Sequence, residues 1–139
     1  MTARQMQYLR CRVGREWYGI AVEQVIEVLQ LVALNEIPGA KPHVLGLLTL
    51  RDVVMPVMDL RLLFGAPEAP LSLDTPIIAI NTAEGPIGVV VDDVDDVQPI
   101  SEFTDQHGHE SPFISAAAKL NDRLLLLLDV ESLREPTAV

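Results

Sequence analysis

Four aspartates, Asp92, Asp93, Asp95 and Asp96, form the densest group of side chains that could hold a metal ion or move a proton. A calcium loop places its carboxylates on a turn with a glycine at the sharp bend. Here valines alternate with the aspartates and no glycine follows them, which is typical of a strand with a solvated acidic edge. The alternative interpretations are a surface for a basic partner and an acidic metal-binding domain.

The histidines and the single cysteine form no catalytic pattern either. His107 and His109 lie two residues apart in a polar stretch and lack the further ligands that a zinc site needs. Cys11 lies in a strand-like segment, where a small half-buried side chain is more common than a nucleophile. No serine has the context of a nucleophile elbow, and the sequence has no glycine-rich phosphate loop. We therefore predict a protein that is not an enzyme and that has no cofactor and no metal site.

Arg51 is the charged residue that the pattern singles out. With Asp52 it separates two apolar runs, 44–50 and 53–58, so it should lie at the tip of a β-hairpin. One interpretation is an ordinary solvated turn charge. The other is a recognition arginine at the rim of an apolar surface, beside a groove between two lobes. There its guanidinium could bind a partner's carboxylate through two hydrogen bonds.

The hairpin at 44–58 is the element around which the rest of the chain is arranged. Its apolar runs predict buried strands, and Pro56, which cannot donate a hydrogen bond, predicts an edge strand or a bulge. Asp59 should cap a short helix over 60–64 that ends at Gly65. Residues 25–32 predict a strand, with a helix over 22–31 as the competing interpretation. The remaining expected elements are strands at 7–13, 16–20, 76–81, 86–91, 94–100, 113–120 and 123–128 and a short helix at 130–135.

The sequence contains an internal repeat of about seventy residues. YGIAVEQVIEV at 18–28 aligns with IGVVVDDVDDV at 87–97, so that Gly19 falls on Gly88, 69 positions later. A second block, which includes Asp59 and its counterpart Asp129, follows in the same order with an offset of 70. Two blocks at nearly the same offset predict two β-lobes of like topology.

The predicted boundaries are about 14–65 for the first lobe and about 76–134 for the second, and strands near the termini are free to exchange between them. Lobes of this size are marginal alone, so they should pack together as a single domain over 1–139. The formal net charge of −10 disfavours nucleic acid and membrane surfaces as partners. No apolar run is long enough to insert into a membrane, and we expect a cytoplasmic protein.

Four segments identify a family resemblance: EWYGIAVEQVIEVL, IPGAKPHVLGLLTLRDVVMPVMDLRLLFG, IIAINTAEGPIGVVVDDVDDV and FISAAAKLNDRLLLLLDVESL. The chain resembles the CheW-like family, the adaptors of bacterial chemoreceptor arrays, from about Gln7 to Leu133. The resemblance implies a mainly β fold of two packed five-stranded SH3-like barrels with short helices. It also implies a non-enzymatic adaptor that couples the cytoplasmic tip of a chemoreceptor to the regulatory domain of a CheA-type histidine kinase, in arrays at the inner face of the membrane.

By the same resemblance, Val25, Glu27, Gly46 and Arg51 stand where family adaptors have residues implicated in receptor or kinase contact. The family usually has Asn-Leu-Arg-Gly at the central hairpin, whereas this chain has Asp52 in place of the glycine. Aspartate adopts a positive φ angle more readily than most residues, but the aim of Arg51 could change. An adaptor of a non-chemotaxis array, for pili or surface motility, is therefore the alternative function.

Overall fold

The computed structural model describes residues 6–67, 70–104, 111–120 and 123–134. Strands dominate, and the helices are short. The elements are β1 (Met6–Val13), β2 (Glu16–Ala21), the 3-10 helix η1 (Val22–Gln24), β3 (Val25–Gln30), β4 (Val44–Leu50), β5 (Val53–Asp59), α1 (Leu60–Leu63), β6 (Pro76–Thr82), β7 (Gly85–Val90), β8 (Asp93–Ile100), β9 (Phe103–Thr104), β10 (Ile114–Leu120), β11 (Arg123–Leu128) and α2 (Val130–Arg134).

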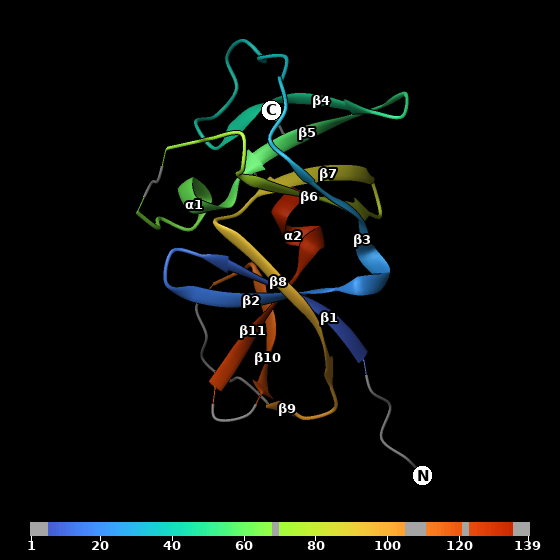
Figure 1. The fold of residues 1–139 in the computed structure, drawn as a ribbon, viewed down its shortest axis with the longest axis vertical. Helices are drawn as coiled ribbons and strands as arrows, with labels where there is room; N and C mark the ends of the chain where they lie inside the picture. Colours follow the sequence, from blue (N-terminus) through green and yellow to red (C-terminus); the bar gives the residue numbers. More distant parts are fainter. Residues whose placement is uncertain (1–5, 68–69, 105–110, 121–122, 135–139) are drawn as a thin grey trace.

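The strands form two sheets that are stacked one above the other in Figure 1. A five-stranded sheet has the order β3-β6-β7-β5-β4, and a six-stranded sheet has the order β8-β1-β2-β11-β10-β9. Each forms an SH3-like barrel lobe. We call the first the central barrel, because residues 25–90 supply all its strands. The second is the terminal barrel, because its strands come from 6–21 and 93–128. The predicted mainly β fold of two packed lobes is confirmed.

The internal repeat is visible in the topology, but the two halves exchange their first hairpins. If β1, β2, β3, β4 and β5 are exchanged with β6, β7, β8, β10 and β11, the order of the five-stranded sheet becomes that of the six-stranded sheet without its last strand, β9. The β1–β2 hairpin nevertheless pairs with β8 and β11, while the β6–β7 hairpin pairs with β3 and β5. The lobes therefore depart from the expected boundaries of 14–65 and 76–134. Sequence similarity shows that two segments fold alike, but it does not show which strands they pair with.

The repeat aligns Gly19 with Gly88, and the two glycines occupy equivalent positions in the two sheets. Each lies in a parallel pair that attaches an exchanged hairpin, with Gly19 opposite Leu127 and Gly88 opposite Val57. A Cβ atom at either position would lie 3.0 Å from a methyl group of that partner. The close approach of the strands therefore explains why both repeats have glycine here.

Apolar side chains pack in three clusters. One lies between the lobes and includes Ile20 of the terminal barrel and Met58 of the central barrel. The other two fill the barrels, around Met55 in the central barrel and around Leu125 in the terminal barrel. Because the cluster between the lobes takes buried residues from both sheets, the lobes are joined by a continuous core.

Pro56 predicts an edge strand or a bulge in its own strand, and this prediction is wrong. The β5 strand lies between β7 and β4, and the two-for-one shift of register in the hairpin belongs to β4. The strand tolerates the proline because its cross-strand neighbour, Leu47, directs its N–H and C=O groups to Asn35. On the other side, β7 joins β5 only from Val57 onward. Neither neighbouring strand therefore requires an N–H group from Pro56.

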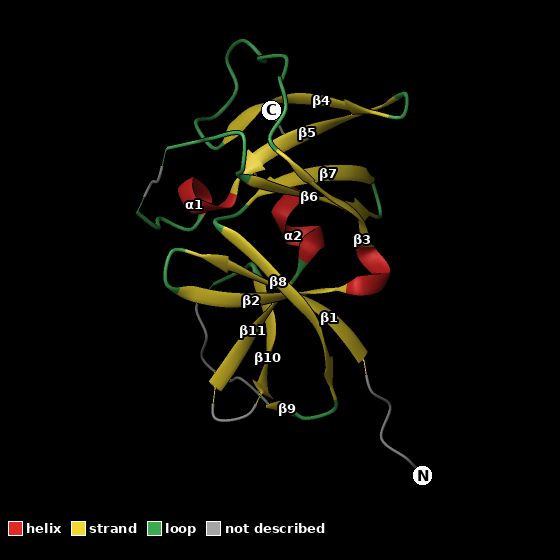
Figure 2. Ribbon diagram, in the orientation of Figure 1, coloured by secondary structure: helices red, strands yellow, loops and turns green. Residues whose placement is uncertain are grey.

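The local predictions around the short helices are confirmed. Residues 25–30 form the strand β3, preceded by η1, and no α-helix forms there. The carboxylate of Asp59 caps α1 by accepting a hydrogen bond of 2.9 Å from the backbone N–H of Arg61. Figure 2 shows the three short helices at the level where the two lobes meet. In the described part of the chain, no helix has the length and apolar character needed to cross a membrane.

Candidate partner-binding site

The tip of the β4–β5 hairpin has the turn that the sequence predicts. Arg51 and Asp52 form a two-residue loop between the paired residues Leu50 and Val53. Their φ angles are 49° and 66°, and two positive values are typical of a type I′ turn, whose twist matches that of a hairpin. A residue other than glycine in this conformation costs about 1 kcal/mol. The turn therefore holds a bulky arginine in a strained conformation.

Arg51 is held in place by an ion pair with Glu27. A guanidinium nitrogen of Arg51 lies 2.5 Å from a carboxylate oxygen of Glu27, which comes from β3 at the other edge of the sheet. Since β3 and β4 are the two edges of this sheet, the ion pair spans the gap where the central barrel closes. The Arg51 side chain is 72% exposed, so a partner can reach it.

The position of Arg51 relative to the lobes differs from the prediction. The far end of the hairpin, at Asp59, leads into Leu60, which is buried in the core between the lobes. Arg51 lies at the opposite end, and Figure 1 shows this tip pointing to the side of the central barrel, in the layer of strands farthest from the terminal barrel. The predicted location beside the groove between the lobes is therefore not supported, and a partner of Arg51 would approach this side of the central barrel.

Gly46 has a steric role in the closure of the same barrel. Its φ angle is 153°, and a Cβ atom built there would lie 2.5 Å from the carbonyl oxygen of Asn35. Asn35 forms two backbone hydrogen bonds with Leu47, of 2.7 and 3.0 Å, which join the chain after β3 to the outer edge of β4. Any side chain at Gly46 would push this segment away, so the glycine is required by the backbone.

Val25 lies on a different side of β3 from the exposed apolar residues. It is half-buried and packs against the core between the lobes. The side chains that follow Val25 along β3 alternate between exposed and partly buried. Ile26 and Val28 are exposed, and Glu27, which lies between them in the sequence, is partly buried. Of the four residues that the resemblance implicates, the structure brings Glu27 and Arg51 together. Val25 instead packs against the core between the lobes, and Gly46 makes room for the backbone of Asn35.

Exposed apolar residues adjoin Glu27 and Arg51 along the chain. Ile26 and Val28 flank Glu27 along β3, and Val53 and Val54 follow the turn on β5, with exposed fractions between 43% and 58%. We call these four residues and the ion pair the hairpin surface: Ile26, Glu27, Val28, Arg51, Val53 and Val54. Large apolar side chains near a fixed charge are the usual composition of a protein-binding surface.

The aspartate cluster is divided between different partners. Asp92 is largely buried and binds two groups, the guanidinium of Arg61 at 3.4 Å and the backbone N–H of Gly14 at 2.7 Å. Asp95 forms an ion pair of 2.7 Å with Arg10 on the neighbouring strand. Among the residues that the structure describes, no group of three or more carboxylate, histidine or cysteine side chains could hold a metal ion. The solvated-edge interpretation therefore fails for Asp92, which is a structural residue.

A buried network that the sequence did not reveal links the two repeats through Asp92. Arg61 binds both carboxylate oxygens of Asp59, at 3.0 and 2.9 Å, and only 3% of its side chain is exposed. The hydrogen bond with Asp59 raises the pKa of Arg61, and burial opposes that shift. The network joins α1 to Asp92 and, through Asp92, to the β1–β2 turn. The internal repeat does not point to this network, because the residue that aligns with Arg61 is Glu131, which has the opposite charge.

Glu131, which the repeat aligns with Arg61, holds the turn of the other exchanged hairpin directly. Its carboxylate oxygens accept hydrogen bonds of 3.0 and 3.1 Å from the N–H of Ala83, the residue that the repeat aligns with Gly14. A carboxylate therefore holds the turn of each exchanged hairpin. Cys11 takes no part in such a site, because burial raises the pKa of its thiol to about 12 and keeps it protonated. His107 and His109 lie outside the described residues.

The model of the CheW-like domain family matches residues 7–136 of the chain. The chain belongs to the CheW-like domain family. Proteins of this family are scaffolds and adaptors. The chain is 31% identical to the chemotaxis protein CheW of Bacillus subtilis over 125 residues, which cover 86% of this chain and 80% of that protein.

Two further comparisons agree with this assignment. The chemotaxis protein CheW of Klebsiella aerogenes is 29% identical over 135 residues, covering 91% of this chain and 80% of that protein. Among solved structures, the scaffolding protein TtCheW from Thermoanaerobacter tengcongensis superposes with a TM-score of 0.80 at 25% identity, over 91% of this chain and 90% of the other. The fold and the family are therefore shown independently by sequence and by structure.

Proposed function

We propose that this protein is a non-enzymatic adaptor that couples the cytoplasmic tip of a chemoreceptor to the regulatory domain of a CheA-type histidine kinase. Membership of the CheW-like family over nearly the whole chain is the observation that carries the proposal. The protein would work in the cytoplasm, in arrays at the inner face of the membrane. No nucleic acid, cofactor or metal takes part, and the net charge of −10 is unfavourable for polyanionic partners.

The hairpin surface is the proposed contact for one of these partners. Its apolar residues are exposed in the isolated chain, and covering them would remove apolar area from water at about 25 cal/mol per Å². The strained φ angle of Arg51 supports a role beyond folding, because glycine would form the same turn without strain. Glu27 orients the guanidinium, whose other N–H groups would bind a carboxylate on a helical partner.

The test is the affinity of Arg51 variants for a receptor cytoplasmic fragment and for the kinase regulatory domain. Arg51→Ala should weaken binding of at least one partner by tenfold or more, which corresponds to about 1.4 kcal/mol. Arg51→Lys should recover only part of the loss, since an ammonium group cannot reproduce the planar fork of the guanidinium. The matched control is Lys119→Ala, which removes an exposed cation from the terminal barrel.

Two results would contradict this proposal. Arg51→Ala binding both partners like the parent would reduce Arg51 to a solvated turn residue. Failure of the parent chain to bind either partner would remove the adaptor function itself. A thermal melt of each variant separates a binding defect from loss of the fold, and we expect a small change because the ion pair is exposed.

A second candidate function is an adaptor in an array that does not serve chemotaxis. A match to the protein PilI of Pseudomonas aeruginosa favours it, with 28% identity over 97 residues that cover 68% of this chain and 54% of that protein. Recovery of the native kinase by co-purification, followed by deletion of the adaptor and assays of swimming and surface motility, distinguishes the two functions. Loss of swimming alone supports the first candidate, and loss of surface motility alone supports the second.

A further inference from the structure

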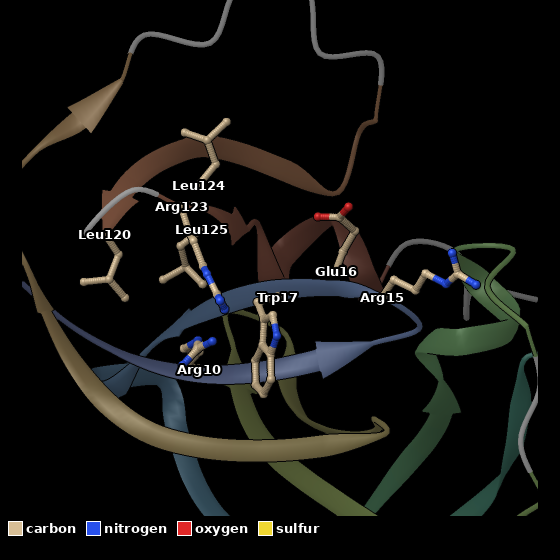
Figure 3. Close-up of a pocket in the computed structure, with 8 residues that line it drawn as sticks. All are labelled: Arg10, Arg15, Glu16, Trp17, Leu120, Arg123, Leu124 and Leu125. Carbon is tan, nitrogen blue, oxygen red and sulfur yellow. The ribbon is translucent and has the colours of Figure 1, made fainter.

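The terminal barrel has a cavity of about 750 Å³ at its open end. The walls come from β1, β2, β10 and β11, and Figure 3 shows the side chains that line it. Three of the ten lysine and arginine residues of this acidic chain lie here, together with its single tryptophan. The eight lining residues are Arg10, Arg15, Glu16, Trp17, Leu120, Arg123, Leu124 and Leu125.

The charged side chains of the cavity are placed around Trp17. The guanidinium of Arg10 lies 4.0 Å from the centre of the Trp17 ring and also pairs with Asp95 at 2.7 Å. Figure 3 shows Arg123 beside these two residues, whereas Arg15 points away from them. In the described part of the chain, no carboxylate forms an ion pair with Arg123 or Arg15. Arg123 is therefore a cation that can bind a carboxylate from outside.

The internal repeat shows that the fold does not require these residue types. Arg10 lies opposite Gly19, and its repeat counterpart Ala79 lies opposite Gly88. Arg123 lies opposite Leu120, and its counterpart Val53 lies opposite Leu50. In the same way, Trp17 corresponds to a proline. The central-barrel counterparts of Arg10, Trp17 and Arg123 are all uncharged: Ala79, Pro86 and Val53. A barrel of this topology forms with small apolar residues at these positions, so two arginines and a tryptophan need another explanation.

We propose that this open end of the terminal barrel binds a short acidic and apolar peptide segment of a partner protein. One carboxylate of the segment binds the guanidinium of Arg123, with the Arg10–Trp17 pair beside it. An adjacent apolar side chain packs against the accessible apolar lining, which comes from Trp17, Leu120 and Leu124. The site lies in the other lobe from the hairpin surface and does not depend on the function proposed for that surface.

The size and the walls of the cavity favour a peptide over a free anion. A volume of about 750 Å³ is within the range of sites that enclose drug-sized ligands, and a phosphate ion would fill only a small part of it. A small anion would also leave the partly exposed side chains of Trp17, Leu120 and Leu124 in water. A nucleic acid strand is unfavourable because the whole chain carries a net charge of −10.

Trp17 makes the test direct, because the only tryptophan of the protein lies in the site. The probe is a hexapeptide of alternating glutamate and leucine, titrated into the full chain while tryptophan fluorescence is recorded at low and at high salt. We expect a saturable change that weakens as salt rises, because the carboxylate contacts are screened. Arg123→Glu should weaken the affinity by at least tenfold, and Arg123→Gln should weaken it less. Lys119→Glu, which makes the same charge change on the paired strand outside the cavity, should leave it unchanged.

Control peptides test both parts of the proposed chemistry. A lysine and leucine hexapeptide should not bind, and a glutamate and serine hexapeptide should bind at least tenfold more weakly than the probe. The proposal is overturned if the probe gives no saturable change, or if Arg123→Glu and Arg123→Gln both bind it like the parent while their thermal melts are unchanged. Equal affinity for the serine peptide, or displacement of the probe by millimolar phosphate, would show a plain anion site and would also overturn it.

Discussion

Arg61→Met is the substitution that tests the buried network most directly. It removes the guanidinium that binds Asp59 twice and Asp92 once, and it leaves two largely buried carboxylates without their cation. Breaking a buried ion pair by removing one partner costs about 3–5 kcal/mol. Since domains of this size are stable by about 5–15 kcal/mol, the variant should lose a large part of its stability.

Urea denaturation, followed by the fluorescence of Trp17, measures this loss. With a urea dependence of about 2 kcal/mol per molar, the midpoint for Arg61→Met should fall by about 1.5–2.5 M. The matched control is Arg51→Met, which makes the same change in an ion pair whose arginine is 72% exposed. That control should cost less than about 1 kcal/mol.

A rescue experiment separates charge from packing. Adding Asp59→Asn and Asp92→Asn to Arg61→Met removes both buried charges but keeps oxygens that can accept the hydrogen bonds from the N–H groups of Arg61 and Gly14. The triple variant should recover at least half of the lost stability. Equal losses for Arg61→Met and Arg51→Met, or no recovery in the triple variant, would refute the view that the network is a buried electrostatic link.

Three further substitutions test other features of the fold. Gly46→Ala should destabilise the protein by about 2 kcal/mol or more, because its Cβ would collide with Asn35, and a melt checks this. An unchanged melt with weakened partner binding would instead make Gly46 a contact residue. Asp52→Gly should raise the stability to urea by about 1 kcal/mol by relieving the positive φ angle. Above about pH 9 the unfolded chain loses the thiol proton that folded Cys11 keeps up to about pH 12, so stability should fall by about 1.4 kcal/mol per pH unit. Urea midpoints against pH should show a smaller slope for Cys11→Ala, and equal slopes would refute this account.

The features that the sequence predicts correctly depend on neighbouring residues. The Arg51–Asp52 turn follows from two charges between apolar runs, and the capping role of Asp59 follows from its place before a short helix. The two-lobe topology follows from the repeat, since a local pattern that occurs twice folds twice in the same way. The first two inferences need only residues that are close together in the chain, and the third needs only the recognition of a local pattern that recurs about seventy residues later.

The features that the sequence does not predict depend on contacts between distant residues. Asp92 lies 31 positions from Arg61 and 78 from Gly14, so nothing local marks it as buried. The tolerance of Pro56 depends on where the hydrogen bonds of its neighbouring strands go, which a single strand cannot reveal. The basic cavity was missed because Arg10 and Arg123 meet only after the terminal barrel brings the two ends of the chain together.

The exchanged hairpins also govern how the chain can fold and how it can be divided. The strands of the central barrel all come from residues 25–90, but the β1–β2 hairpin pairs with β8 and β11, which begin only at residues 93 and 123. This raises the contact order of the terminal barrel and should slow its folding. A cut between the repeats, in the stretch before β6, would leave each fragment with strands of both barrels and a complete set for neither. The two halves are therefore alike in sequence but obligate complements of each other.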